Sequence, residues 1–175
     1  MRLPGTGRLE AVGIPRGATG CTQESPPNNL EALRRRLLIN RLRGGTAAII
    51  VEPFGPESGT RPVHPDFNRQ LRKLCDEFDT LLVFVRAGMG GAQAYFNVMP
   101  DITVLGKCLT GGYPMAGAIG GRRDVMELLA GGIGTSARRA FVGGTLSANP
   151  LSCVAGSAGG PGRDHRAPRS ALCRL

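Results

Sequence analysis

This sequence of 175 residues has only two side-chain amines, Lys73 and Lys107. All the others of its 22 Lys and Arg residues are arginines. Lys107 follows Gly106 directly after Ile102-Thr103-Val104-Leu105, an apolar run typical of a buried strand. A lysine at the end of such a strand can form a Schiff base if its surroundings desolvate the amine. Position alone favours the ordinary alternative, a surface lysine with a solvated head group.

The other chemical motifs tested against the sequence are not supported. Lys107 does not belong to a phosphate-binding P-loop, because Asp101 stands where the first glycine is required and Cys108 where Ser or Thr is required. No G-x-S-x-G motif occurs, and neither of the two histidines has an evident catalytic partner. The five cysteines include no CxxC pair, so we predict reduced thiols rather than a zinc site or a disulfide framework.

The elements that must position Lys107 alternate between short apolar runs and amphipathic stretches. Leucines at helical spacing predict a helix over 30–42, capped by Asn28 or Asn29, and a second apolar stripe predicts a helix over 65–78. Strands are predicted near 47–51, 81–85, 102–105 and 115–119. The first two strands flank a helix as a βαβ unit and should be parallel and buried on both faces. We therefore predict an α/β fold, a mostly parallel sheet with flanking helices.

The ends of the chain differ in character from its middle. Residues 1–28 are polar and interrupted by prolines, so we predict an irregular segment. Residues 29–157 carry the periodic elements, and residues 158–175 form a basic, aperiodic tail that we predict to be disordered. No apolar run reaches the length of a membrane span and no apolar signal core follows Met1, so we expect a cytoplasmic protein with no membrane partner.

The formal charge of +9 raises the question of a nucleic-acid partner. Arginines gather on the outer face of the helix expected over 30–42, at positions 34, 35, 36, 41 and 43. A solvated helix face is the favoured interpretation, because neither aromatic residues nor a glycine-rich loop accompanies these arginines. An Arg-rich nucleic-acid-binding module remains an alternative hypothesis.

Four segments, in order and spacing, resemble the class III, fold type I, pyridoxal-phosphate-dependent aminotransferases, and most of all the glutamate-1-semialdehyde 2,1-aminomutase group. Residues 100–122 resemble the family's lysine segment, and residues 143–151 its Gly-Thr-Leu-Ser-x-Asn-Pro segment. Residues 48–53 resemble the strand that ends in Glu-Pro, and residues 74–84 the next helix and strand. The resemblance covers about residues 11–157 and implies part of the large domain of a fold type I enzyme.

The resemblance also assigns the site residues. Lys107 matches the lysine that holds pyridoxal 5'-phosphate as a Schiff base and moves a proton during catalysis. Thr145 matches the threonine that binds the cofactor phosphate, usually from the partner subunit of a dimer. Gly144, next to it, would let the backbone approach that phosphate closely.

The sequence departs from the family pattern at two places. The family's strand continues into an Asp that pairs with the pyridine nitrogen of the cofactor, whereas Phe84 is followed here by Val85 and Arg86. The family's Gly-Ser/Thr-Glu-Ala phosphate loop, which lies far upstream of the lysine, is not found before residue 45. The chain thus looks like an internal fragment of the family.

These observations lead to one leading hypothesis and a second alternative. The leading hypothesis is an aminotransferase- or aminomutase-like protein that binds pyridoxal phosphate through Lys107 and acts, with impaired activity, on a small amino acid or amino-aldehyde. The alternative is a non-catalytic remnant that acts through dimerisation, as a homodimer or with a full-length relative. We also expect a marginally stable chain with exposed apolar patches, because a buried parallel strand needs cover on both faces.

Overall fold

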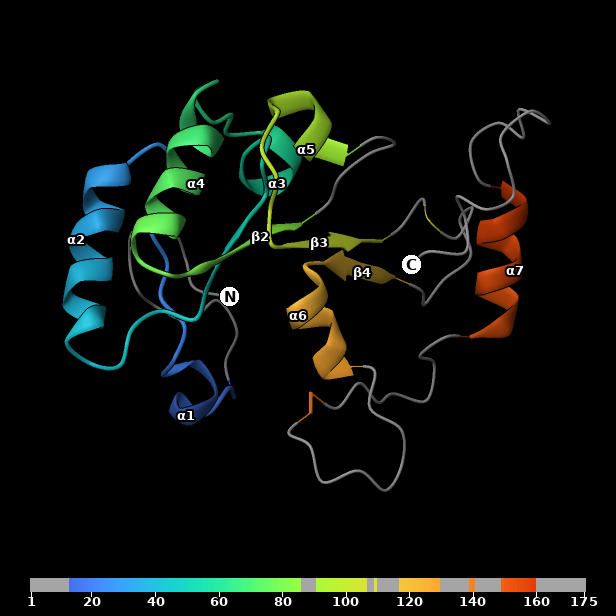
Figure 1. Ribbon diagram of the computed structural model, residues 1–175, viewed down its shortest axis with the longest axis horizontal. Coiled ribbons are helices and arrows are strands. Elements are labelled where there is room, and N and C mark those ends of the chain that lie inside the picture. The colour runs from blue at the N-terminus through green and yellow to red at the C-terminus, as the bar shows by residue number, and fades with distance from the viewer. Residues whose placement is uncertain are drawn as a thin grey trace.

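The computed structural model describes residues 13–85, 91–106, 109, 117–129, 139–140 and 149–159. Its elements follow one another as α1 (Arg16–Thr19), α2 (Leu30–Arg41), β1 (Ala48–Val51), α3 (Pro56–Gly59), α4 (Phe67–Glu77), β2 (Leu81–Val85), α5 (Gly91–Phe96), β3 (Ile102–Leu105), β4 (Ala118–Gly121), α6 (Arg123–Met126), the 3₁₀ helix η2 (Glu127–Leu129) and α7 (Pro150–Gly159). Figure 1 shows α3, α4 and α5 on one side of the strands, with α2 beside α4.

The four strands form one sheet in the order β1-β2-β3-β4. The first three are parallel, with Ile50 opposite Val83 and Val83 opposite Ile102, and β4 runs antiparallel to β3. The predicted α/β class, with a mostly parallel sheet and flanking helices, is confirmed. The βαβ unit of β1, α4 and β2 is confirmed as well, because the two strands pair in parallel.

The core lies between α4, α5 and one face of the sheet. Phe67, Leu71 and Cys75 of the stripe predicted on the second helix are buried there, while Phe78 is only partly buried. Leu82 and Phe84 of β2 complete the core with no exposed surface. Each such side chain contributes roughly 1.5–3 kcal/mol by leaving water. Cys75 of α4 is fully buried in this cluster, and burial raises the pKa of its thiol to about 12. Cys75 is a free thiol, as the sequence predicted.

The opposite face of the sheet is less well covered. Side chains alternate between the faces along a strand, so Ile50 points away from Ile49 and Val51, which pack against the core. Ile50 is 70% exposed, and Ile119 of β4, on the same face by the pairing register, is 43% exposed. The prediction that β1 is buried on both faces is therefore wrong for this chain, because the described helices pack against β1 on one face alone.

Helix α2 begins where the sequence predicted, since the Asn29 side chain accepts a hydrogen bond of 2.9 Å from the Ala32 N–H. Its apolar stripe is narrower than predicted: Leu37 is buried, whereas Leu38 and Leu42 are exposed. Arg34 forms an ion pair with Glu77 and lies 5.8 Å from the centroid of the Phe78 ring. This arginine therefore fastens α2 to α4 rather than facing water alone.

Two predictions at the level of elements need correction. The fourth strand, predicted over 115–119, is observed at Ala118–Gly121; residues 115–116 lie outside the described residues, and Gly120 and Gly121, which resemble a turn in the sequence, belong to the strand. Short helices α1, α3 and α5 stand where no helix was predicted, α1 inside the segment 1–28 that was expected to be irregular. All three are brief and flanked by Gly or Pro, so they leave little helical periodicity in the sequence.

Helix α7 lies apart from the sheet in Figure 1, and its Leu151 and Val154 are both more than half exposed. Its first turn is capped by the Asn149 side chain, which accepts a 3.0 Å hydrogen bond from the Leu151 N–H. The predicted disordered tail from residue 158 lies outside the described residues after position 159. Within the described part of the chain, no helix combines the length and the apolar character that a membrane span requires.

Candidate functional site

Ligands of open α/β sheets bind at the carboxyl ends of the parallel strands. Here that edge is formed by Val51, Val85 and Leu105, the last residues of β1, β2 and β3. The chain leaves β3 at this edge through Gly106, the residue before Lys107. The strand predicted before Lys107 therefore ends at the carboxyl edge of the parallel strands.

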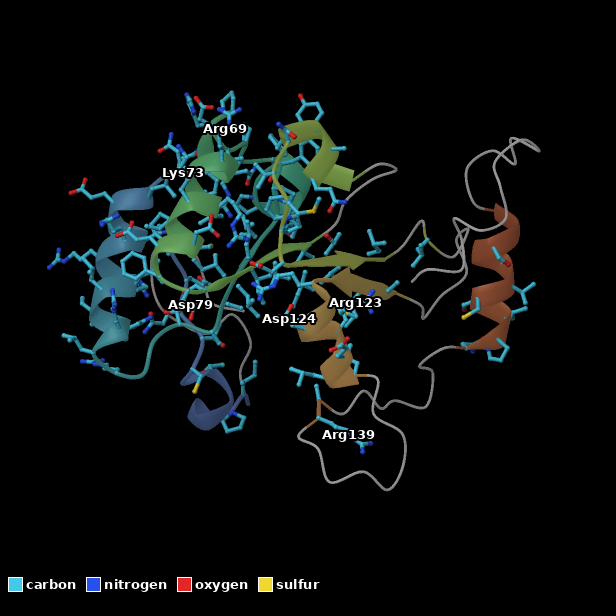
Figure 2. The ribbon with its side chains drawn as sticks, in the orientation of Figure 1. Arg69, Lys73, Asp79, Arg123, Asp124 and Arg139 are labelled. Carbon is cyan, nitrogen blue, oxygen red and sulfur yellow. The ribbon has the colours of Figure 1, made fainter. Side chains whose placement is uncertain are left out.

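The three residues predicted to hold the cofactor, Lys107, Gly144 and Thr145, lie outside the described residues, so their roles stay predictions. On either side of Lys107, the N–H of Leu109 donates a 3.4 Å hydrogen bond to the Gly106 carbonyl. The other amine, Lys73, lies exposed on α4, away from the ends of the strands (Figure 2). No role in the candidate site is assigned to Lys73.

Val85 ends β2 beside the strand that leads to Lys107. It is half-buried and pairs with Val104 of β3. The position that the resemblance assigns to a cofactor-pairing acid thus lies at the carboxyl edge of the sheet, in the strand next to β3. A valine there supplies neither charge nor hydrogen-bond acceptor from its side chain.

The chain segment after β1 is fixed at this edge by a buried amide. Asn68 of α4 is fully buried, and its Nδ2 donates a 2.7 Å hydrogen bond to the carbonyl of Pro53. Gly55 then turns the chain at φ +117°, where a Cβ atom would collide with the carbonyl oxygen of Arg61. A residue other than glycine at position 55 would break this turn.

Three aromatic rings lie beyond the carboxyl end of β1. The Phe54 ring centroid is 5.4 Å from that of Tyr95 and 5.1 Å from that of Phe96, both on α5. Helix α5 is tied to β3 by a 3.0 Å hydrogen bond between Thr103 Oγ1 and Gln93 Oε1. Tyr95 is 75% exposed, so this cluster presents an apolar surface near the expected site.

The amino edge of the same sheet carries the charges. Asp101, immediately before β3, has a side chain only 8% exposed. Its Oδ2 accepts hydrogen bonds from the Leu82 N–H at 2.7 Å and from Arg72 Nη1 at 2.6 Å, and its Oδ1 accepts one from Arg122 Nη1 at 3.0 Å. Burial alone would raise the pKa of Asp101, but these donors hold it below its ordinary value.

A pocket of about 150 Å³ opens at this amino edge, lined by Arg72, Cys75, Asp76 and Arg122 among others. Its arginines are already paired, because Arg72 also binds Asp76 at 2.7 Å and Arg122 also binds Asp124 at 2.6 Å. Figure 2 shows Asp124 at the β4–α6 corner. The pocket is therefore a hollow between ion pairs at the amino edge, opposite the carboxyl edge where ligands of such sheets bind. Within the described residues, no group of acidic, His or Cys side chains could hold a metal ion.

The sequence pattern of class III aminotransferases matches residues 13–159 of this chain. The chain belongs to the class III aminotransferase family. This family depends on pyridoxal phosphate, and solved structures similar to this chain include a transaminase with that cofactor bound.

Individual relatives agree with the family assignment. The chain is 38% identical over 156 residues to the glutamate-1-semialdehyde 2,1-aminomutase of Prosthecochloris aestuarii, and 40% identical over 152 residues to that of Desulforamulus reducens. These matches cover 86% and 83% of this chain but 34% and 33% of the relatives. The chain thus spans about a third of the length of the curated relatives it matches.

The chain likewise spans only part of the solved structures that it matches. An omega-transaminase from Sphaerobacter thermophilus matches with a TM-score of 0.72 and 30% identity, over 90% of this chain and 37% of that enzyme. A glutamate-1-semialdehyde aminomutase from Pseudomonas aeruginosa matches with a TM-score of 0.68 and 28% identity, over 88% and 36%. The predicted likeness to part of a fold type I enzyme is confirmed.

The residues of this chain fit the cofactor in part. The sequence supplies an amine after β3 and a Gly-Thr pair, while the end of β2 carries Val85 instead of an acid. Sequence reasoning missed the buried charge cluster around Asp101. Its partners lie 19 to 29 residues from Asp101 in the chain, so only the packing of α4, β2, β3 and β4 brings them together.

Proposed function

We propose that this chain binds pyridoxal phosphate covalently through Lys107 and carries out amino-group transfer at a rate well below that of an intact class III enzyme. The single observation that carries the proposal is the end of β3: in a chain of this family, the strand ends at the carboxyl edge of a parallel sheet shortly before position 107. The half-buried Val85, at the end of the neighbouring strand, supports the expectation of impaired activity.

The cofactor, when bound, supplies an electron sink for the bonds at the substrate α-carbon. The chain's own residues would divide the remaining work. Lys107 would hold the cofactor and move a proton to and from the substrate carbon, while Gly144 and Thr145 would bind the phosphate. Val85 cannot keep the ring nitrogen protonated, because its side chain has no acid to hold that proton.

The substrate class follows the relatives. Several matched proteins bear the name glutamate-1-semialdehyde 2,1-aminomutase, and others are transaminases. A small amino acid or amino-aldehyde is therefore the proposed substrate of this chain. The exposed rings of Tyr95 and Phe54 offer apolar surface at the same edge of the sheet.

The test is covalent trapping. The purified chain is mixed with pyridoxal phosphate, reduced with borohydride, digested and analysed by mass spectrometry, and we expect the adduct on the peptide that contains Lys107. Lys107→Ala should abolish this adduct. Lys73→Ala is the matched control, because it removes the other amine from an exposed helix face, and it should leave labelling at Lys107 unchanged.

Activity is measured on the same preparations with a panel of amino acids and an amino-aldehyde. A trapped adduct with weak turnover supports the proposal. An adduct found chiefly at Lys73 contradicts the lysine assignment, and turnover equal to that of an intact relative contradicts the inferred consequence of Val85.

A second candidate, association through the sheet, has its own observation. Ile50 and Ile119 lie exposed on the less covered face, at the two outer strands of the sheet. Apolar side chains left exposed on a sheet face favour association with a second protein surface. We infer a homodimer, or a complex with a longer class III chain, and sedimentation at increasing protein concentration tests it: a monomer throughout contradicts the homodimer.

A further inference from the structure

The cluster around Asp101 joins three strands at one point. Besides its side-chain bonds, the Asp101 N–H donates to the Leu82 carbonyl at 2.9 Å, and its carbonyl accepts from the Arg122 N–H at 2.9 Å. Leu82 belongs to β2, and Arg122 directly follows β4. The residue therefore fixes β2, β3 and β4 relative to one another at the amino edge of the sheet, through both its backbone and its carboxylate.

Strand β4 does little to specify its own pairing register. It reads Ala118-Ile119-Gly120-Gly121, and its single large side chain, Ile119, is partly exposed. Gly121 lies so close to β3 that a Cβ atom would collide with the carbonyl oxygen of Asp101. Glycine-rich strands with few buried side chains are prone to slip. A two-residue slip would bring Ile119 into the place of Gly121, so β4 must first move away from β3. The contacts between Arg122 and Asp101 hold the two strands together at this point.

That register decides the geometry at the opposite end of the hairpin. In the observed pairing Leu105 lies opposite Ala118, and a Cβ atom at Gly117 would lie 2.9 Å from the Leu105 carbonyl oxygen. A slip of two residues keeps every side chain on its face but displaces the strand ends by about 7 Å. Residues 106–117, which include Lys107, join these two ends, so a slip of β4 changes the distance that this segment must span.

We propose that Asp101 is a positioning residue: by holding Arg122 and Leu82 it fixes the β3–β4 register and thereby the separation of the two strand ends that residues 106–117, Lys107 among them, connect. The part that concerns Lys107 rests on the proposed function. The opposing interpretation is that Asp101 only stabilises the fold. The two differ in whether the loss of Asp101 changes the pairing of β3 with β4 in molecules that are still folded.

Engineered cysteine pairs measure the register directly. Leu105→Cys with Ala118→Cys places two thiols opposite each other in the observed pairing, whereas Thr103→Cys with Ala118→Cys places them opposite only after a two-residue slip. After mild oxidation the linked peptides are identified by mass. With Asp101 intact we expect the first pair to link and the second to stay open.

Two variants then remove the clamp. Asp101→Asn keeps the side-chain volume but removes the charge that binds both arginines. Arg122→Met removes only the side-chain part of the connection between Asp101 and the end of β4, at a side chain that is 53% exposed. The second variant keeps the test decisive if the first one unfolds. In both we expect the yield of the first engineered disulfide, between positions 105 and 118, to fall and that of the second, between positions 103 and 118, to rise. Asp124→Asn is the matched control, because it removes the exposed partner of Arg122 and leaves Asp101 intact.

Borohydride labelling gives the functional readout. We expect the ratio of Lys107 to Lys73 adduct, corrected for the folded fraction, to fall at least about tenfold in Asp101→Asn and Arg122→Met, since misplacement by an ångström or more costs factors of this size. An unchanged disulfide pattern in both variants overturns the register lock. An altered pattern with an unchanged labelling ratio overturns the positioning role. Absence of Lys107 labelling in the parent chain contradicts the proposed function and with it the positioning role, while the cysteine pairs still decide the register.

Discussion

The two edges of the sheet treat charge in opposite ways. At the amino edge, the buried Asp101 carboxylate receives a backbone N–H and two guanidinium groups. At the carboxyl edge, Val85 ends β2 where the family resemblance calls for a carboxylate. The buried charge that joins the strands thus lies at the amino edge, whereas the charge that the proposed chemistry would need has no counterpart at Val85 on the carboxyl edge.

The largest effect should come from supplying the missing charge at the carboxyl edge. Val85→Asp places an acid at the end of β2, where it could keep the ring nitrogen of the cofactor protonated. We expect turnover to rise by about 10²–10³, the size typical of one preorganised electrostatic partner. The measurement is the steady-state rate with the best amino acid of the panel.

Val85→Asn is the matched control, since it adds a similar side chain without the negative charge. An equal gain in both variants contradicts the electrostatic argument. No gain in Val85→Asp, in protein that still carries the Lys107 adduct, contradicts the assignment of position 85.

Removing the charge at the amino edge should affect stability instead. Asp101→Ala leaves Arg72 and the Leu82 N–H without a buried acceptor, and we expect a loss of about 3 kcal/mol in the free energy of unfolding. Urea titration followed by circular dichroism measures it. Asp124→Ala should change stability little, because that ion pair lies at the surface. Equal losses in the two variants would contradict the role of burial.

The pH dependence of stability should also reflect the amino edge. The pKa of Asp101 is lower in the folded chain than the ordinary value near 3.9, so its contribution is complete above about pH 3.9 and is lost as the pH falls through the folded value. Arg72 and Arg122 face this carboxylate, and Asp76 and Asp124 share those arginines. We expect Arg122→Met to move acid unfolding to higher pH. An unchanged acid transition in that variant would contradict the coupling.

The smallest effect on stability is expected at the exposed face of β1. Ile50→Ser removes an apolar side chain that is largely in water, so the free energy of unfolding should change by less than about 0.5 kcal/mol. Association should weaken nevertheless, because the face loses its most exposed apolar contact. Sedimentation at matched concentrations tests this expectation. Leu42→Ser serves as the control, because Leu42 is an exposed leucine that directly follows α2, and it should leave association unchanged.

The parts of the fold that could be predicted are those in which local pattern and tertiary packing agree. The apolar runs of β1, β2 and β3 and the stripe of α4 could be found because their spacing matches the period of the element. Strand β4 was misplaced because its glycines signal a turn, whereas in the sheet they permit close approach to Asp101. Local pattern does not carry that kind of information.

The candidate site also has a part that could be predicted from the sequence and a part that could not. Lys107 could be singled out because lysine is scarce and follows a buried strand, and the resemblance added Gly144 and Thr145. The Asp101 cluster could not be predicted, because its partners come from separate elements and meet only in the folded sheet. The sign of a charge is visible in a sequence, but its desolvation is a property of the packed structure.

The rate at which the buried thiol of Cys75 reacts can report how often the core of this chain opens. A thiol with a pKa near 12 carries almost no thiolate at neutral pH, and no reagent reaches it while α4 stays on the sheet. Cys21 and Cys153 are exposed and should react with an alkylating reagent at once. The delay between their modification and that of Cys75 therefore reports how often the core opens, without any engineered residue, and the same delay can be followed when cofactor or a partner chain is present.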